Sequence, residues 1–402
     1  MRGFGLADTI RRRRHERSPS MKRNPWRVLA AVAIVTAGVG LIVATYILCL
    51  DDNSLTQRDF VAYWSAESQF LHGANPYDPA VMLQQERALG LDRNQPIMLY
   101  SPPVAFFLGA PFGVFSAKTG LILWLLALLG CLVASIGLLG LLFGRPDDRF
   151  YMLGFMFPPA LACMSAGQIG IFLLLGLALF LYLHHSRPWL AGVALLPCAM
   201  KPHLFLPLAI VLLLWIVTRK AYRILAGFAL ALAVACALPL AINPHIWSQY
   251  FRMMHDGLAL NIYAPTLCST FRLHVARQAP WTQFILEAAA CCWAPWYFWT
   301  RRDRWRWMEQ GMLLLLVAAL CSPFGWVTDE AILLPAVLVG LYRALESRRS
   351  LLPLWLIAAA ALIEVMAGAQ ITTPYYIWTT PAWLLWYLYA TGKFPPSLHH
   401  AR

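Results

Sequence analysis

Residues 119–143 read TGLILWLLALLGCLVASIGLLGLLF and contain no charged side chain. About 20 apolar residues suffice to carry a helix across the hydrocarbon core of a bilayer, so this run predicts a membrane-spanning helix. The rest of the chain has the same character, because its 402 residues are 60% hydrophobic and only 13% charged. A soluble protein of this length does not need so much apolar side chain. The composition therefore indicates an all-α polytopic membrane protein.

The charged residues indicate the orientation of the chain in the membrane. Lys and Arg number 32 against 19 Asp and Glu, a net charge of +13. The basic residues cluster in short breaks between apolar runs, at 11–14, 219–223, 301–306 and 343–349. Clusters in such breaks are typical of cytoplasmic loops and do not indicate a nucleic-acid partner. Hydropathy and these loops predict about twelve transmembrane helices with both termini cytoplasmic, in a plasma (inner) membrane.

The predicted spans divide the chain into one membrane domain and two tails. Residues 1–25 form a basic cytoplasmic tail, and the first span, 26–50, is too long for a cleaved signal and is expected to be retained. A single integral-membrane domain covers 26–392, and 393–402 form a cytoplasmic tail. Residues 102–115 are apolar but short and interrupted by prolines. We expect them to be interfacial or re-entrant rather than spanning.

Two long polar segments are predicted on the extracytoplasmic side. The first outward loop, 51–103, follows the first span and contains short helices; the second covers 243–280. An ordered loop of this length in an otherwise apolar chain is where a functional site is expected. The nine cysteines show no zinc-ligand spacing, and no nucleotide-binding glycine motif occurs. We therefore predict neither a metal nor a cofactor.

Asp59 opens a predicted helix that runs to about His72, with Tyr63 on the same face. A carboxylate at a helix start is often only a cap. Alternatively, ionised Asp59 is a general base that accepts a proton from a hydroxyl nucleophile. Asp78, in the turn that ends this segment, is expected to be structural.

Other polar residues interrupt the apolar runs on the same predicted side of the membrane. Gln168 either bonds a polar ligand or satisfies a neighbouring helix. Lys201, followed by Pro202 and His203, either binds an anionic group such as a phosphate or extends to the interface and ends a helix. Asp329 and Glu330 either pair with an outward arginine such as Arg272 or bind substrate.

Tyr77 and Tyr100 belong to the first outward loop. Their rings either stack on a sugar or anchor the chain at the membrane interface, where Tyr and Trp are common. The sequence does not distinguish between these two interpretations.

The motifs together resemble those of glycosyltransferase family 87, polyprenyl-phosphate-mannose-dependent α-mannosyltransferases within the GT-C superfamily. The resemblance rests on short motifs in a fixed order: Asp59 with Tyr63 a turn later, the Gly73–Pro79 turn, Tyr100-Ser-Pro-Pro103, Gly167-Gln168, Lys201-Pro202, and Ser322-Pro323 with Trp326. It covers roughly residues 55–340.

The resemblance implies a GT-C-type bundle whose first outward loop bears the catalytic residue. An inverting transfer from a polyprenyl-phosphate-linked sugar to a hydroxyl of a lipid or glycan acceptor would use Asp59 as base. Lys201, helped by Arg58, would stabilise the departing phosphate, while Gln168 and Tyr100 would contact sugar or phosphate. The remaining residues assigned to substrate binding are Tyr63, Tyr77, His203, Trp326 and Asp329. One departure is that Thr328-Asp329-Glu330 stands where family members often carry a histidine.

Two alternatives of other classes remain from the sequence. A multi-span transporter or lipid flippase would need charged residues within its spans, and Glu364 is the acidic residue that lies well inside an apolar run. A structural assembly partner with an inactive site would tolerate replacement of Asp59, whereas an enzyme would not.

Overall fold

The computed structural model describes residues 58–144, 148–257, 263–367 and 374–392. Helices dominate these residues, which contain no β-strand, so the predicted all-α class is confirmed. The predicted first span, 26–50, and both predicted tails, 1–25 and 393–402, lie outside the described residues.

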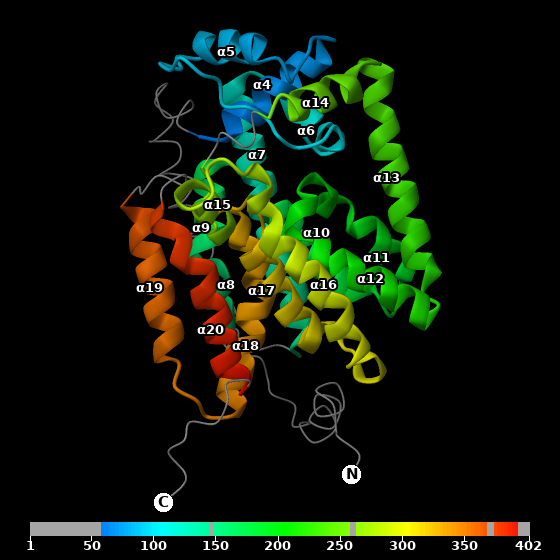
Figure 1. Ribbon diagram of the computed structural model, residues 1–402, viewed down its shortest axis with the longest axis vertical. Helices are drawn as coiled ribbons and strands as arrows, with labels where there is room; N and C mark the ends of the chain where they lie inside the picture. Colours follow the sequence, from blue (N-terminus) through cyan, green and yellow to red (C-terminus); the bar gives the residue numbers. More distant parts are fainter. Residues whose placement is uncertain (1–57, 145–147, 258–262, 368–373, 393–402) are drawn as a thin grey trace, which may run out of the picture.

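Four helices gather at one end of the molecule and form what we call the loop layer (Figure 1). They are α4 (Phe60–Leu71), α5 (Pro79–Ala88), α6 (Ala105–Gly113) and α14 (Ile246–His255). Asp78 caps α5, since its side chain accepts from the backbone N–H of Ala80 at 2.8 Å and of Val81 at 3.4 Å. The structural role expected for Asp78 is therefore confirmed.

The apolar segment 102–115 forms a helix that is too short to cross a bilayer. Its helix, α6, has only 9 residues and contains Pro111. At a rise of about 1.5 Å per residue it measures roughly 14 Å, about half of a bilayer core. Figure 1 shows it within the loop layer, in agreement with the sequence-based expectation.

Among the described residues, two helices are long and apolar enough to cross a membrane alone: α7 (Ala117–Leu142) and α13 (Tyr222–Ile242). The first corresponds to the predicted span 119–143. Only 33% of the most apolar window of α7 and 22% of that of α13 is buried. Leu230 and Leu238, for example, are exposed on α13. Exposed apolar surface of this extent is typical of helices in contact with lipid, which is consistent with a membrane protein.

The other helices of the bundle are shorter, so the structure does not establish the predicted count of about twelve spans. They are α8 (Asp148–Phe155), α9 (Pro158–Ala166), α10 (Gly170–Leu183), α11 (Pro188–Ala194), α12 (Leu206–Arg219), α15 (Leu267–His274), α16 (Ile285–Trp299), α17 (Met312–Cys321), α18 (Leu334–Glu346), α19 (Leu352–Met366) and α20 (Thr379–Thr391). Single-turn helices extend several of them: η1 (Leu196–Met200), η2 (Pro202–Leu204), η4 (Pro280–Phe284), η5 (Arg302–Arg304), η6 (Trp307–Gly311), η7 (Asp329–Leu333) and η8 (Pro374–Trp378).

The two ends of the molecule differ in charge. Three basic turns, 219–223, 301–306 and 343–349, lie at the end of the bundle away from the loop layer, which we call the basic end (Figure 1). Arg219 donates to the Arg302 carbonyl at 2.8 Å, and Arg343 pairs with Glu309 at 3.1 Å. At the opposite end, Asn243 donates to the Ala74 carbonyl at 3.2 Å and ties the second outward loop to the first.

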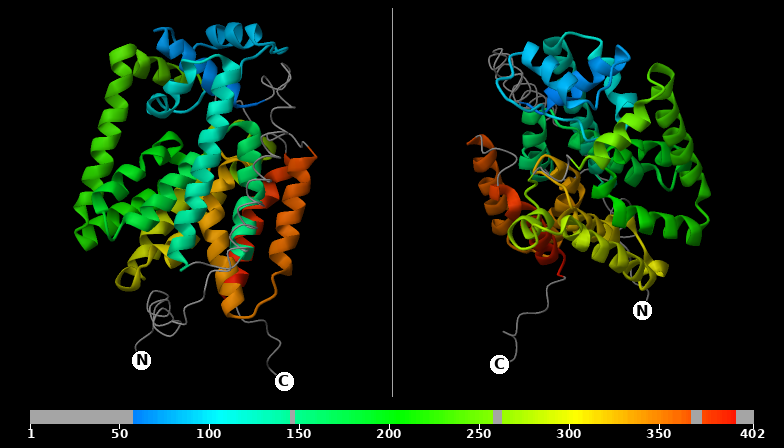
Figure 2. Two further views of the ribbon diagram at one scale, coloured as in Figure 1. Left: turned by 180° about the vertical axis from the view of Figure 1, so that it is seen from behind. Right: turned by 45° about the horizontal axis from the view of Figure 1, so that its top comes forward.

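Helix α13 connects the basic end to the loop layer (Figure 2). Its 21 residues measure about 31 Å, which matches the thickness of a bilayer core. The basic turns and the loop layer therefore lie about one membrane thickness apart.

Candidate functional site

Three helix breaks, each predicted from the sequence, converge beneath the start of α4. The first separates α9 from α10, where Gly167 adopts a left-handed backbone with φ of +68°. A Cβ atom at this position would lie 2.7 Å from Cβ of Phe60, so the close approach of α4 also requires glycine. The other two breaks are Lys201, before Pro202, and the turn before η7, which begins at Asp329.

Asp59 faces the first of these breaks. Within the described part of the chain its side chain forms no hydrogen bond to the backbone of α4, so Asp59 does not cap this helix. Its Oδ2 instead accepts from Nε2 of Gln168 at 2.8 Å. Burial raises the pKa of Asp59; the hydrogen bond from Gln168 and the charge of Lys201 oppose that rise, and the charge of Asp329 adds to it.

A continuous polar chain runs from Asp59 to Asp329. Oε1 of Gln168 accepts from the Tyr63 hydroxyl at 2.8 Å and from Nζ of Lys201 at 3.3 Å. Nζ of Lys201 also pairs with Oδ1 of Asp329 at 2.6 Å, and both side chains are almost fully buried. The structure thus joins two carboxylates, an amide and an ammonium group contributed by segments far apart in sequence.

Trp326 completes this cluster. Its backbone N–H donates to Oδ2 of Asp329 at 3.2 Å, and its ring centroid lies 5.6 Å from Nζ of Lys201. Both carboxylate oxygens of Asp329 are therefore bonded, Oδ1 to Lys201 and Oδ2 to the backbone N–H of Trp326. An outward arginine was the alternative partner for Asp329, but Lys201 occupies that position.

The remaining predicted residues take no part in this polar chain. Tyr77 is 2% exposed and donates to the Ser101 carbonyl at 2.9 Å, inside the packed loop layer. Tyr100 is half-buried and packs against the hydrophobic core. Arg58 borders the site, since it donates to the carbonyl of Ser165 on α9. His203 lies beside the ring of Phe324, with 5.9 Å between the ring centroids.

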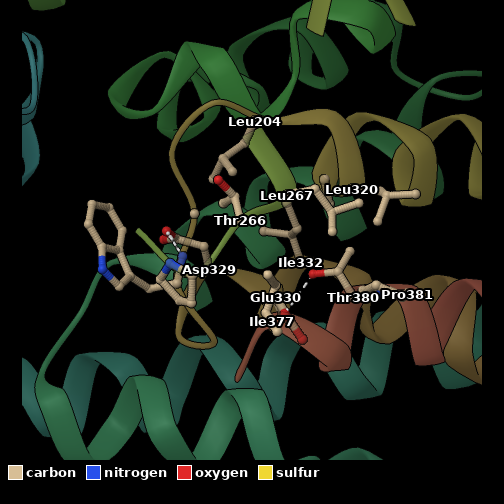
Figure 3. Close-up of a pocket in the computed structure, with 14 residues that line it drawn as sticks. Leu204, Thr266, Leu267, Leu320, Asp329, Glu330, Ile332, Ile377, Thr380 and Pro381 are labelled. Carbon is tan, nitrogen blue, oxygen red and sulfur yellow. Dashed lines mark hydrogen bonds between the residues drawn. The ribbon is translucent and has the colours of Figure 1, made fainter. Parts of the chain in front are cut away.

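A pocket opens beside Asp329 and Glu330 (Figure 3). Its wall combines Asp329, Glu330 and Trp326 with two threonines and mainly apolar side chains: Leu204, Pro265, Thr266, Leu267, Ala319, Leu320, Gly325, Ile332, Ile377, Thr380 and Pro381. The resemblance assigned Asp59, Gln168 and Lys201 to one catalytic site. None of these three lines this pocket, because they pack against one another.

Glu330 has a structural role that the sequence left open. It accepts from the hydroxyls of Thr379 at 2.5 Å and Thr380 at 2.7 Å, and from Nε1 of Trp383 at 3.2 Å. These bonds fasten the start of α20 to η7. The two threonines lie about 50 residues further along in an apolar segment, so no local signal in the sequence could identify them.

Trp124 is a second residue that the sequence did not single out. Its Nε1 donates to the Gly167 carbonyl at 2.9 Å, and its ring lies 5.5 Å from that of Tyr63. Trp124 lies on α7 and therefore stabilises the turn at Gly167 between α9 and α10. A tryptophan in a run of leucines carries no sequence signal of this kind.

Among the described residues no group of three His, Cys, Asp or Glu side chains is arranged to bind a metal ion. Glu364, the residue that a transporter would need, accepts from Nε1 of Trp378 at 3.1 Å. It lies outside the polar chain.

A family model described as glycosyltransferase family 87 matches residues 99–323, more than half of the chain. The matched range includes Gln168, Lys201 and the start of the Ser322-Pro323 turn; Asp59 and Asp329 lie outside it. Searches among curated proteins and among solved structures gave no match.

Proposed function

Because the chain belongs to glycosyltransferase family 87, we propose that this membrane glycosyltransferase takes a hexose, with mannose the first candidate, from a polyprenyl-phosphate donor. Asp59 is the proposed general base. The observation that carries the proposal is the polar chain, in which one amide separates the carboxylate of Asp59 from the ammonium of Lys201. Family membership also favours an enzyme over the transporter alternative.

The proposed reaction is a single displacement at the anomeric carbon. The acceptor hydroxyl oxygen attacks this carbon while Asp59 takes the hydroxyl proton, and the bond from the carbon to the phosphate oxygen breaks. Its electron pair leaves with the lipid phosphate, and attack from the opposite face inverts the configuration. A raised pKa makes Asp59 a stronger base than an ordinary carboxylate once it has lost its own proton.

Lys201 is the proposed cation for the departing phosphate. An ammonium group has three N–H donors, and two of those of Lys201 are directed at Asp329 and Gln168. The third has no partner among the described residues, and we assign it to a phosphate oxygen. A fixed donor aimed at developing negative charge is among the strongest contributions to catalysis in a water-poor site.

The proposed orientation places the site on the extracytoplasmic face of the plasma (inner) membrane, with both termini cytoplasmic. The separation of the basic end from the loop layer by α13 supports this orientation. A lipid donor and a lipid or glycan acceptor would both reach the site from the membrane or its outer surface.

The test is sugar transfer in membranes that contain wild-type protein or Asp59→Asn. Radiolabelled polyprenyl-phosphate mannose is supplied first, followed by other lipid-linked sugars. Loss of a general base is expected to lower kcat by about 10²–10⁴-fold. Asp78→Asn is the matched control, because Asn retains the cap on α5. Transfer by Asp59→Asn at the wild-type rate would assign the base to another residue.

A further inference from the structure

The amide of Gln168 has an unambiguous orientation. Its Nε2 faces Asp59, a carboxylate that only accepts, whereas its Oε1 faces donors on Tyr63 and Lys201 and, at 3.4 Å, the backbone N–H of Ile169. A flipped amide would oppose donor to donor and acceptor to acceptor. The polar end of Gln168 is therefore engaged within the protein.

The backbone of Gln168 is held as firmly as its side chain. Its N–H donates to the Cys163 carbonyl at 3.0 Å, and its own carbonyl accepts from Sγ of Cys163 at 3.0 Å. Trp124 fixes the preceding carbonyl of Gly167. Gln168 is thus anchored in the protein and is poorly placed to turn toward a sugar.

A direct contact between Asp59 and Lys201 would harm the proposed reaction at both ends. An ammonium beside a carboxylate lowers the pKa of the carboxylate and weakens it as a base. The same contact would occupy the remaining N–H of Lys201, which the phosphate needs. The neutral amide of Gln168 lies between the two groups and bonds to both.

We propose that Gln168 is a positioning residue that keeps Asp59 and Lys201 apart at a fixed separation, so that the base and the phosphate-binding cation serve opposite ends of one displacement. This inference rests on the proposed function for its catalytic meaning. The effect of Lys201 on the pKa of Asp59 can be measured without any sugar transfer.

Two substitutions of Gln168 test whether it keeps Asp59 and Lys201 apart, because they are expected to shift the pKa of Asp59 in opposite directions. Gln168→Glu has the same shape but places a second carboxylate against Asp59, so the pKa of Asp59 is expected to rise. Gln168→Ala removes a hydrogen bond that lowers the pKa of Asp59, but it also lets the ammonium of Lys201 reach the carboxylate. A charged contact stabilises a carboxylate more than one bond from a neutral amide does, so the pKa of Asp59 is expected to fall overall. Infrared titration of the full-length protein in lipid measures both shifts, and the Asp59 carbonyl band is assigned by its loss in Asp59→Asn.

Transfer kinetics supply the second readout. Both Gln168 variants are expected to lower kcat at least tenfold and to move the acid limb of the pH–rate profile in the direction of the infrared shift, with the donor KM changed less than about threefold. Gln85→Glu and Gln85→Ala are the matched controls, because Gln85 is a half-buried glutamine that bonds to Gln69 on α4.

Each outcome decides the proposal. Opposite infrared shifts in the two variants support it, even if wild-type protein transfers no sugar, in which case only the proposed function fails. An unshifted Asp59, or a raised pKa in Gln168→Ala, overturns it. A higher donor KM with intact kcat also overturns it and makes Gln168 a substrate contact. If one variant does not fold, the sign of the other decides.

Discussion

Replacements of Lys201 can distinguish the effect of its positive charge from the effect of its side-chain shape. Its ammonium is buried, pairs with Asp329 at 2.6 Å and is the proposed phosphate ligand. We expect Lys201→Met to lower kcat/KM by about 10²–10³-fold, because a donor aimed at the leaving group is lost. Lys201→Arg keeps the charge but not the compact shape of the ammonium, so only partial recovery is expected.

The Lys201 measurement is transfer at matched protein abundance. Removing the lysine alone leaves the carboxylate of Asp329 buried and unpaired, which destabilises a protein by about 3–5 kcal/mol. The double variant Lys201→Met with Asp329→Asn removes both charges and is expected to restore stability but not transfer. Lys220→Met, at the basic end, is the control. Wild-type kcat/KM in Lys201→Met would exclude Lys201 as the phosphate ligand.

Glu86 predicts a pH dependence of stability. Burial raises the pKa of Glu86 from 4.5 to about 7. The hydrogen bond from the Ile97 N–H and the charge of Arg93 both act to lower this pKa but do not cancel the effect of burial. Between these values the folded protein holds a proton that the unfolded chain has lost. Stability therefore falls as the pH rises from about 4.5 to 7 and is lowest above 7.

Glu86→Gln removes this dependence. We expect the variant to be more stable than wild type above pH 7, by on the order of 1 kcal/mol once solvent screening is included, and to have a flatter stability profile below it. Thermal unfolding in detergent across this pH range measures the effect. Asp92→Asn, an exposed carboxyl in the next loop, controls for the loss of a charge. A parallel shift at all pH values would contradict the assignment.

At the scale of single residues, the sequence identified the polar groups but not their pairing. Asp59, Gln168 and Lys201 each stand out because they interrupt apolar sequence. Their hydrogen bonds join positions separated by 109 and 33 residues, and the ion pair between Lys201 and Asp329 spans 128. Pairing over such separations is set by helix packing, which local patterns do not encode.

At the scale of helices, glycines allow α11 and α13 to touch. A Cβ atom at Gly192 would lie 2.0 Å from the Ile224 carbonyl oxygen, and one at Gly227 would lie 2.2 Å from that of Trp189. Backbones approach this closely where small residues line a membrane helix interface. The contact is reciprocal, because each helix supplies one glycine and one carbonyl.

We expect Gly192→Ala to destabilise the protein by about 1–3 kcal/mol, since the added methyl group meets backbone that cannot rotate away. Gly137→Ala on α7 is the matched control: nothing lies within 4 Å of its Cβ position, and alanine gains about 0.5–1 kcal/mol of helix propensity. Thermal unfolding in detergent compares the two. Equal stability of both variants would mean that α11 and α13 separate easily.

The sequence predicted helix breaks better than helix counts. Gly167 and Pro202 end helices for local reasons, a left-handed backbone and a proline, and the breaks occur where they were expected. The predicted second outward loop, 243–280, contains the short helices α14 and α15, which the sequence did not single out. Short helices that end within the bundle also do not correspond one-to-one with spans, which hydropathy alone could not show.

At the scale of the whole molecule, the distribution of charge predicts which end faces the cytoplasm. Basic turns occupy one end, the loop layer the other, and α13 joins them over about one bilayer thickness. The positive-inside rule predicts that the basic end is cytoplasmic. The proposed base and cation then lie toward the extracytoplasmic end, where a lipid-linked donor would have to be presented.

Cysteine labelling tests this orientation. Asn94 in the loop layer's connecting segment and Ser347 at the basic end are both exposed. In right-side-out membrane vesicles, a membrane-impermeant maleimide is expected to label Asn94→Cys at once and Ser347→Cys only after detergent is added. The parent protein, with its native cysteines, gives the background. The reverse pattern would place the basic end outside, and the proposed site would then have to draw its donor from the cytoplasmic leaflet.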